Sequence, residues 1–157
     1  MSNRQDIHNS DIPVVCRSCE ARHRGICGSL EADQLMQLSK HTTRRTLDPG
    51  STLLSDSSEI KTFSNILSGV VKLTKTLSDG RQQIVGLQFA PDFIGRPFKL
   101  ESSIDAEAAT DLTVCSFPKN VLDRLISDSP NLEHQLLQQT LNELDEARQW
   151  MVTLGRK

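Results

Sequence analysis

Hydrophobic and polar positions divide the chain into a middle section of short alternating stretches and a C-terminal section with helical spacing. Turn residues close the middle stretches, and Asp79 and Gly80 stand between an alternating run that ends at Leu77 and the run 82–89. An Asp-Gly pair in this setting predicts a β-hairpin whose two central turn residues have positive φ. Short strands at this spacing are typical of an antiparallel sandwich or barrel.

The middle section is flanked by one predicted helix and one predicted strand. A short helix is expected at 30–39, with Ser29 as its N-cap and an apolar side formed by Leu30, Leu35 and Leu38. The stretch 109–117 predicts the last strand, which ends before a proline. We therefore expect a mainly β fold with a helix at its N-terminal side.

The C-terminal section predicts two helices, of which the second is long. The first, 119–126, is followed by a Ser-Asp-Ser-Pro stop, and Ser129 and Pro130 have the residue types of an N-cap and a first helical position. No glycine or proline interrupts the chain from there to Leu154. A stripe of apolar and small residues recurs with an average period of 3.5: Leu137, Thr140, Leu144, Ala147, Met151 and Leu154.

A stripe of this period is typical of the seam of a two-stranded coiled coil, so we expect a homodimer. Glu143 and Arg148 flank the seam and can pair between chains in a parallel dimer. Leu136 and Leu141 lie off the seam and are expected to pack on the β domain of the same chain. The alternative is an ordinary amphipathic helix that lies on its own domain.

Composition and charge reduce the number of functional classes to consider. The chain has 157 residues, about one domain, and a net charge of −2, which gives no overall attraction to nucleic acid or to anionic lipid. The first eleven residues are polar and lack the apolar region of a signal peptide, and nothing resembles a membrane span. We therefore expect a reducing, cytoplasmic setting without a membrane partner, in which disulfides rarely persist.

Three of the four cysteines lie within twelve residues, with the spacing C-x2-C-x7-C from Cys16 through Cys19 to Cys27. The fourth, Cys115, lies far along the chain. Unrelated buried thiols would explain Cys115 alone, but a segment rich in arginine and glycine offers the other three little core. Four thiolates suit either tetrahedral zinc or an iron–sulfur cluster, and the residues alone leave both open.

An enzyme is the least supported class. The histidines outside the cysteine segment are His8, His41 and His134, and none stands beside a plausible nucleophile. No glycine-rich phosphate loop is present. We therefore expect no catalytic residues.

Taken together, these motifs resemble the FNR-type oxygen-responsive regulators of the CRP/FNR superfamily, in particular the FnrN-like branch. The resemblance runs from Cys16 to Lys157 and rests on four stretches. These are the cysteine set, "LSDGRQQIVGLQFAPDFIGRPF" in the hairpin region, "DLTVCSFP" around the fourth cysteine, and "SPNLEHQLLQQTLNELDEARQWMVTLGRK" in the long helix.

The resemblance implies a fold, a cofactor and partners. The fold would be α+β but mainly β, a double-stranded β-roll of the cyclic-nucleotide-binding type with a short N-terminal helix and a long C-terminal dimerisation helix. The cofactor would be an oxygen-labile [4Fe–4S] cluster on Cys16, Cys19, Cys27 and Cys115. It would hold a homodimer and permit DNA binding in a full-length relative. The alternative is a zinc-stabilised or small-ligand-binding β-roll that only dimerises.

Two departures from the family pattern limit the expected partners. Family members continue into a helix-turn-helix domain, whereas this sequence ends at Lys157. DNA and RNA polymerase are therefore expected only through that missing domain or in a full-length form. Cyclic-nucleotide binders of this fold carry a Gly-Glu pair and an Arg-Ser. Here Arg96 follows Gly95, and 98–113 contains no arginine, so binding of cyclic AMP is not expected.

The expected organisation has four parts. They are a flexible tail at 1–13, a cysteine-rich cluster-binding loop at 14–28, a β-roll sensory domain at 29–118, and a helical segment at 119–157 with its dimerisation helix at 130–155.

Overall fold

The computed structural model describes Pro13, Cys16, Cys19 and residues 24–156. The expected tail, 1–13, lies outside the described residues except for Pro13, which is buried. Within the described part of the chain, no helix is both long and apolar enough to cross a membrane.

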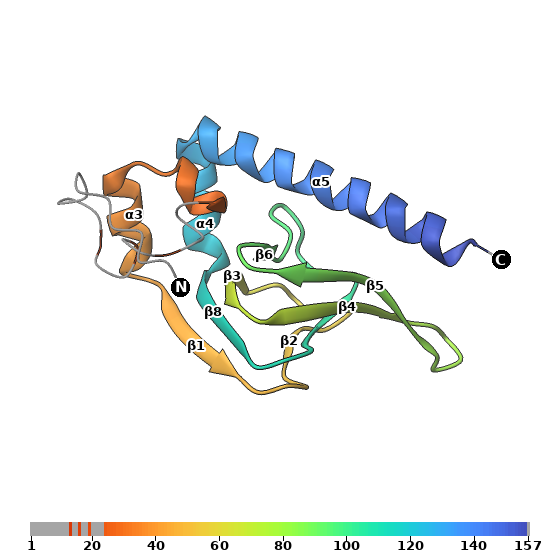
Figure 1. The fold of residues 1–157 in the computed structure, drawn as a ribbon. Coiled ribbons are helices and arrows are strands. Elements are labelled where there is room, and N and C mark those ends of the chain that lie inside the picture. Colours follow the sequence, from red (N-terminus) through yellow and green to blue (C-terminus); the bar gives the residue numbers. More distant parts are fainter. Residues whose placement is uncertain (1–12, 14–15, 17–18, 20–23, 157) are drawn as a thin grey trace.

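Two antiparallel four-stranded sheets form the body of the fold (Figure 1). The first has the order β1-β8-β3-β6, and the second has the order β2-β7-β4-β5. Their bounds are β1 Thr43–Leu47, β2 Thr52–Leu54, β3 Thr62–Ser68, β4 Val70–Thr76, β5 Gln82–Phe89, β6 Phe93–Ile94, β7 Asp105–Ala108 and β8 Leu112–Pro118. The expected mainly β roll is confirmed.

The strands β3 and β8 are buried on both faces, which separates two cores. Ile66 and Val114 are paired and belong to the core between the two sheets. Phe63 and Phe117 are paired on the other face and belong to a second core that the helices cover. This arrangement gives β3 four consecutive buried residues, which no alternating pattern predicts.

The helices gather at one end of the roll, and only the last extends along it (Figure 1). The 3₁₀ helix η1 Ile26–Ser29 precedes α3 Ala32–Ser39, and α4 Lys119–Asp128 precedes α5 Pro130–Leu154. Ser129 caps α5 through its side chain and Pro130 occupies the first turn, as the sequence predicts. The expected cap of α3 is wrong: the N-cap is Glu31, which forms a capping box with Gln34, and Leu30 lies before the helix.

The β4–β5 hairpin is confirmed, but its turn differs from the expected one. The connection spans 77–81 instead of two residues, and within it only Gly80 has positive φ. Asp79 instead accepts a hydrogen bond from the backbone N–H of Arg81 through its carboxylate. A longer loop with one left-handed glycine needs no second residue at positive φ.

Sequence reasoning also missed a strand boundary. The alternation from Val71 to Leu77 corresponds to β4, and a separate strand, β3, ends just before Gly69. Gly69 has φ +98, and a Cβ there would overlap the carbonyl oxygen of Asp111. Only glycine permits this close approach of backbone to backbone.

Candidate metal centre

Cys115 lies in the middle of β8, between two neighbouring strands. Arg44 of β1 is its partner on one side, and Asn65 of β3 is its partner on the other. Residues directly opposite each other in antiparallel strands point to the same face of a sheet. Arg44, Cys115 and Asn65 therefore form a row on one face, the face that also carries Phe63 and Phe117 and meets the helices.

The other three cysteines approach this face from the N-terminal segment. The backbone N–H of Cys19 donates to the carbonyl of Cys16 over 3.3 Å, so the C-x2-C pair lies on one turn of chain. Cys27 lies in η1 and is buried, and Cys16 packs against the same core. The Nδ2 group of Asn65 donates to the Sγ of Cys27 over 3.4 Å.

All four cysteines line one small cavity. Its other lining residues come from α3, β1 and β3 and from the turn before β1: Leu38, Ser39, Thr42, Arg44, Asn65 and Leu67. Cysteines distant in sequence are thus brought together. Among the described residues, no group of three or more His, Cys, Asp or Glu side chains is arranged to hold a metal ion. That the four thiols bind one inorganic centre stays a prediction.

Negative charge on Cys27 or Cys115 is unfavourable unless a cation is bound beside it. Burial, followed by the neighbouring thiols of Cys19, Cys115 and Cys16, raises the pKa of Cys27 far above its ordinary value. Burial and Cys19 also raise the pKa of Cys115, while Arg44 and a hydrogen bond with Thr42 oppose this rise. Such a set favours the thiolate form only when a positively charged centre compensates the desolvation.

The cysteine segment shares its core with the base of the long helix. η1 packs against α5, and α4 packs against both α3 and α5. Cys27 of η1 and Leu132 and Leu136 of α5 belong to one buried cluster. A change in the position of Cys27 therefore acts directly on the N-terminal half of α5.

The predicted dimer seam lies mostly on the exposed surface of the single chain. Leu137 is 56% exposed and Met151 is 69% exposed, and Leu144 and Leu154 are also exposed. Arg148 is exposed beside them. Leu136 is buried, as expected, whereas Leu141 is 51% exposed and lines a groove between α5 and β5. A long helix with this much exposed apolar surface is typical of a protein interface.

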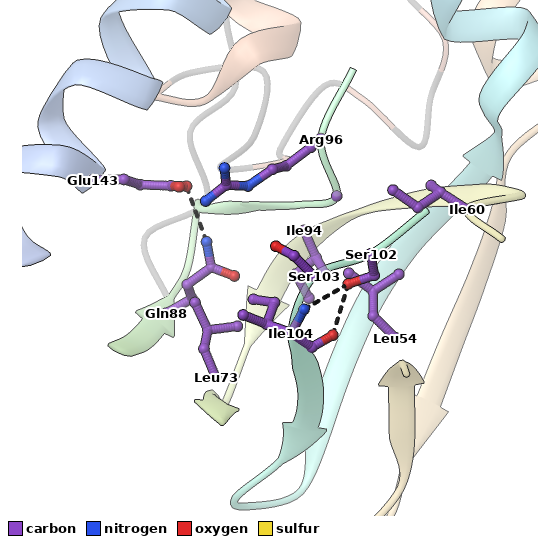
Figure 2. Close-up of a pocket in the computed structure, with 11 residues that line it drawn as sticks. Leu54, Ile60, Leu73, Gln88, Ile94, Arg96, Ser102, Ser103, Ile104 and Glu143 are labelled. Atoms are coloured by element: carbon purple, nitrogen blue, oxygen red, sulfur yellow. Dashed lines mark hydrogen bonds between the residues drawn. The ribbon is translucent and has the colours of Figure 1, made fainter. Parts of the chain in front are cut away.

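Glu143, expected to pair across a dimer, instead contacts its own roll. Its carboxylate accepts a hydrogen bond from Gln88 of β5 over 3.0 Å, at a pocket between the roll and α5 (Figure 2). Burial raises the pKa of Glu143, and the nearby Arg96 opposes this rise. Arg96 is the only lysine or arginine among the described residues that line this pocket.

Replacing Glu143 with glutamine is expected to stabilise the folded chain at neutral pH. The raised pKa means that the folded chain retains this proton better than the unfolded chain. The stability that this proton contributes is present below the ordinary Glu pKa of about 4.3 and is lost as pH rises through the folded pKa. The gain should be on the order of 0.5 kcal/mol, because solvent screens a partly exposed group.

Urea unfolding of wild-type and Glu143→Gln protein between pH 4 and pH 8 measures this effect. The exposed Asp145→Asn change on the same helix is the matched control. The prediction would be contradicted if the Glu143 variant and wild type differed in stability by the same amount at pH 4 and at pH 8.

Two residues beside the cysteines were missed by sequence reasoning, namely Arg44 and Asn65. Arg44 lies in "TTRRTL" and Asn65 lies in "TFSNILS", and neither stretch shows a clear alternation. An asparagine close to Phe63, Ile66 and Leu67 was the one available signal, because asparagine is depleted in strands.

Comparison with known proteins agrees with this architecture. Two antiparallel sheets followed by a long helix form a β-roll, and residues 44–129, more than half of the chain, match the family described as "Cyclic nucleotide-binding domain". The chain belongs to this family, and the relatives described below are named as transcriptional activators. None of these names describes an enzyme.

Three similar proteins illustrate the relationship. A "Probable transcriptional activator" of Rhizobium leguminosarum bv. viciae is 53% identical over 154 residues, which are 98% of this chain and 64% of that protein. "Transcriptional activator protein FnrL" of Cereibacter sphaeroides is 34% identical over 150 residues, 94% of this chain and 60% of that protein. The structure of FixK2 from Bradyrhizobium japonicum superposes with a TM-score of 0.67 at 25% identity, covering 74% of this chain and 59% of that one.

The chain therefore spans about three fifths of the length of these relatives.

Proposed function

We propose that this chain is the oxygen-sensing region of an anaerobic transcription regulator. Cys16, Cys19, Cys27 and Cys115 would hold a [4Fe–4S] cluster that controls dimerisation through α5. The observation that carries the proposal is the cavity lined by all four cysteines, one of which comes from a strand far along the chain. The resemblance to FNR-type regulators and the relatives' names support the same assignment.

The chemistry of the donor set fits such a cluster. Four cysteine thiolates are the usual ligands of [4Fe–4S] centres. Arg44 supplies a positive charge beside Cys115, and Asn65 supplies an N–H to the sulfur of Cys27. Cationic and hydrogen-bonding neighbours of this kind are the outer-shell groups that stabilise thiolate ligands.

The protein's own contribution is to connect the cysteine segment to the dimer helix. With all four thiolates engaged, η1 is held against β3 and β8, and it supports α5 through Leu132 and Leu136. When the thiolates are released, η1 loses this anchor, because binding energy at a metal site is also folding energy. The bound cluster itself supplies the oxygen-labile chemistry.

A small coupling free energy suffices for the signal. A dimer poised near its dissociation constant responds strongly to a coupling of about 1–3 kcal/mol. In a longer form of the protein, the dimer would present DNA-binding helices and contact RNA polymerase. The setting would be the cytoplasm, and cyclic AMP would not be the ligand, because a single Arg96 that faces Glu143 is a poor partner for a cyclic phosphate.

Iron and sulfide analysis of protein purified without air tests the proposal. We expect about four iron atoms and four sulfide ions per chain, with a visible absorption band that air bleaches. Stoichiometric zinc in a colourless protein would instead establish the zinc-stabilised alternative. Protein without iron, sulfide or zinc would leave only a dimerisation module and would overturn the proposal.

A further inference from the structure

We propose that Asn65 is a positioning residue for the cluster, whose amide N–H donates to the Cys27 thiolate and raises the reduction potential of the bound centre. This inference rests on the proposed function. It concerns a residue of β3 that is not a ligand and that lies between the two parts of the ligand set.

The first argument is the position of Asn65 in the sheet. It lies directly opposite Cys115, in the register of β3 and β8. Its Nδ2 group also reaches the Sγ of Cys27 over 3.4 Å. One amide is therefore adjacent both to the cysteine of the sheet and to a cysteine of the N-terminal segment, and it orients one relative to the other.

The second argument is the cost of keeping an amide there. Asn65 is 1% exposed, and its Oδ1 has no hydrogen-bond partner among the described residues. A buried oxygen without a hydrogen-bond partner destabilises the folded chain. Phe63 lies on the same face of β3 and belongs to an apolar core, so an apolar side chain at position 65 would suit the local packing better. The N–H that faces Cys27 is the polar contact that offsets this cost.

The third argument is the chemistry of the sulfur that accepts the bond. A neutral thiol is a weak acceptor, whereas a hydrogen bond to a charged group is roughly twice as strong as a neutral one. The Asn65 contact therefore contributes most when Cys27 is a thiolate ligand. A donor to a ligating sulfur withdraws electron density from the centre, which raises its potential and slows its oxidation.

The Asn65→Leu change removes the N–H and keeps the number of side-chain heavy atoms. The Asn65→Asp change removes the N–H and keeps the planar shape of the side chain. We expect both variants to bind iron and sulfide when reconstituted without air. Both should have a more negative midpoint potential than wild type, and their visible absorption should bleach in air about threefold faster or more. The free energy of unfolding of the cluster-free leucine variant should equal or exceed that of wild type, because the unpartnered Oδ1 is gone.

Ser64→Ala is the matched control. Ser64 is the adjacent buried residue of β3, and its hydroxyl contacts Ser116 on the opposite face. This variant should leave the potential and the bleaching rate unchanged.

The outcomes separate the inference from the proposed function. Wild-type potential and bleaching rate in both Asn65 variants would overturn the positioning role while the cluster assignment stands. If only one of the two Asn65 variants folds, the potential and bleaching rate of that variant decide whether the positioning role stands. Absence of iron and sulfide from wild-type protein would overturn the proposed function, and the inference with it.

Discussion

Cys115→Ser protein purified without air is expected to retain less than about a tenth of the wild-type iron and to lack its visible absorption band. Cys115 is the one cysteine supplied by the sheet, and it lies between Arg44 and Asn65 in the row that faces the helices. Without Cys115, a cluster bound by the N-terminal thiolates would have no cysteine ligand on β8. The segment then loses the connection through which the cluster would stabilise η1.

The same variant should no longer respond to oxygen. In sedimentation experiments without air, its dimer fraction should equal that of air-exposed wild-type protein. The fold itself should survive, because serine is close to cysteine in size and Cys115 is only partly buried. Far-UV circular dichroism checks this point.

Ser116→Ala is the matched control for Cys115→Ser. It changes the next residue of β8, whose side chain lies on the opposite face and contacts Ser64. It should leave iron content unchanged. Full iron and sulfide in the Cys115 variant would mean that the fourth ligand is another residue, and the proposed ligand set would be wrong.

The second large effect is expected on dimerisation. Leu144→Glu places a charge in the middle of the predicted seam, where two copies would meet. Burial of a leucine contributes about 1.5–3 kcal/mol per side chain, so loss of both copies should weaken the dimer at least about a hundredfold. Because Leu144 is exposed in the single chain, the monomer should fold as wild type does.

Sedimentation of the cluster-loaded protein over a range of concentrations measures this change. Asn142→Glu is the matched control, because Asn142 is exposed two residues away and lies off the seam. It should dimerise like wild type. A Leu144→Glu protein that still dimerises with wild-type affinity would show that the two copies meet elsewhere. The stripe would then not be the interface.

Local chemistry explains which elements could be read from the sequence. The start of α5 follows from Ser129 and Pro130, because a cap and a first-turn proline act within four residues. The hairpin follows from Asp79 and Gly80 for the same reason, but the length of its loop could not be predicted from them. Both features depend on neighbours along the chain.

Two strands that the sequence analysis did not predict show that the residues of a segment do not always determine its conformation. β1 reads TRRTL with an almost wholly exposed pattern, and β7 reads DAEA, which contains no β-branched residue. Their strand conformation comes from ladders with β8 and with β2 and β4. β-propensity is largely a property of these partners, so the segment alone does not show it.

The residues of the candidate metal centre also fall into two groups, those indicated by the sequence and those identified only by the structure. The spacing of Cys16, Cys19 and Cys27 could be recognised from the sequence, because residues so close along the chain can reach one centre in many folds. The sequence also indicated Cys115 as a fourth candidate, through the resemblance. Neither Arg44 nor Asn65 could be identified, because nothing in the sequence states which residues of other strands lie opposite Cys115.

By itself, the sequence determined the cysteine spacing, the start of the long helix, its apolar stripe and the hairpin, all of which depend on contacts within a few residues. The tertiary structure alone decided that Cys115 and the three N-terminal thiols line one cavity, that Asn65 faces Cys27, and that η1 supports α5. The physical reason is strand register. Pairing between β1, β8 and β3 selects the neighbours of Cys115, and register depends on the whole sheet and its packing.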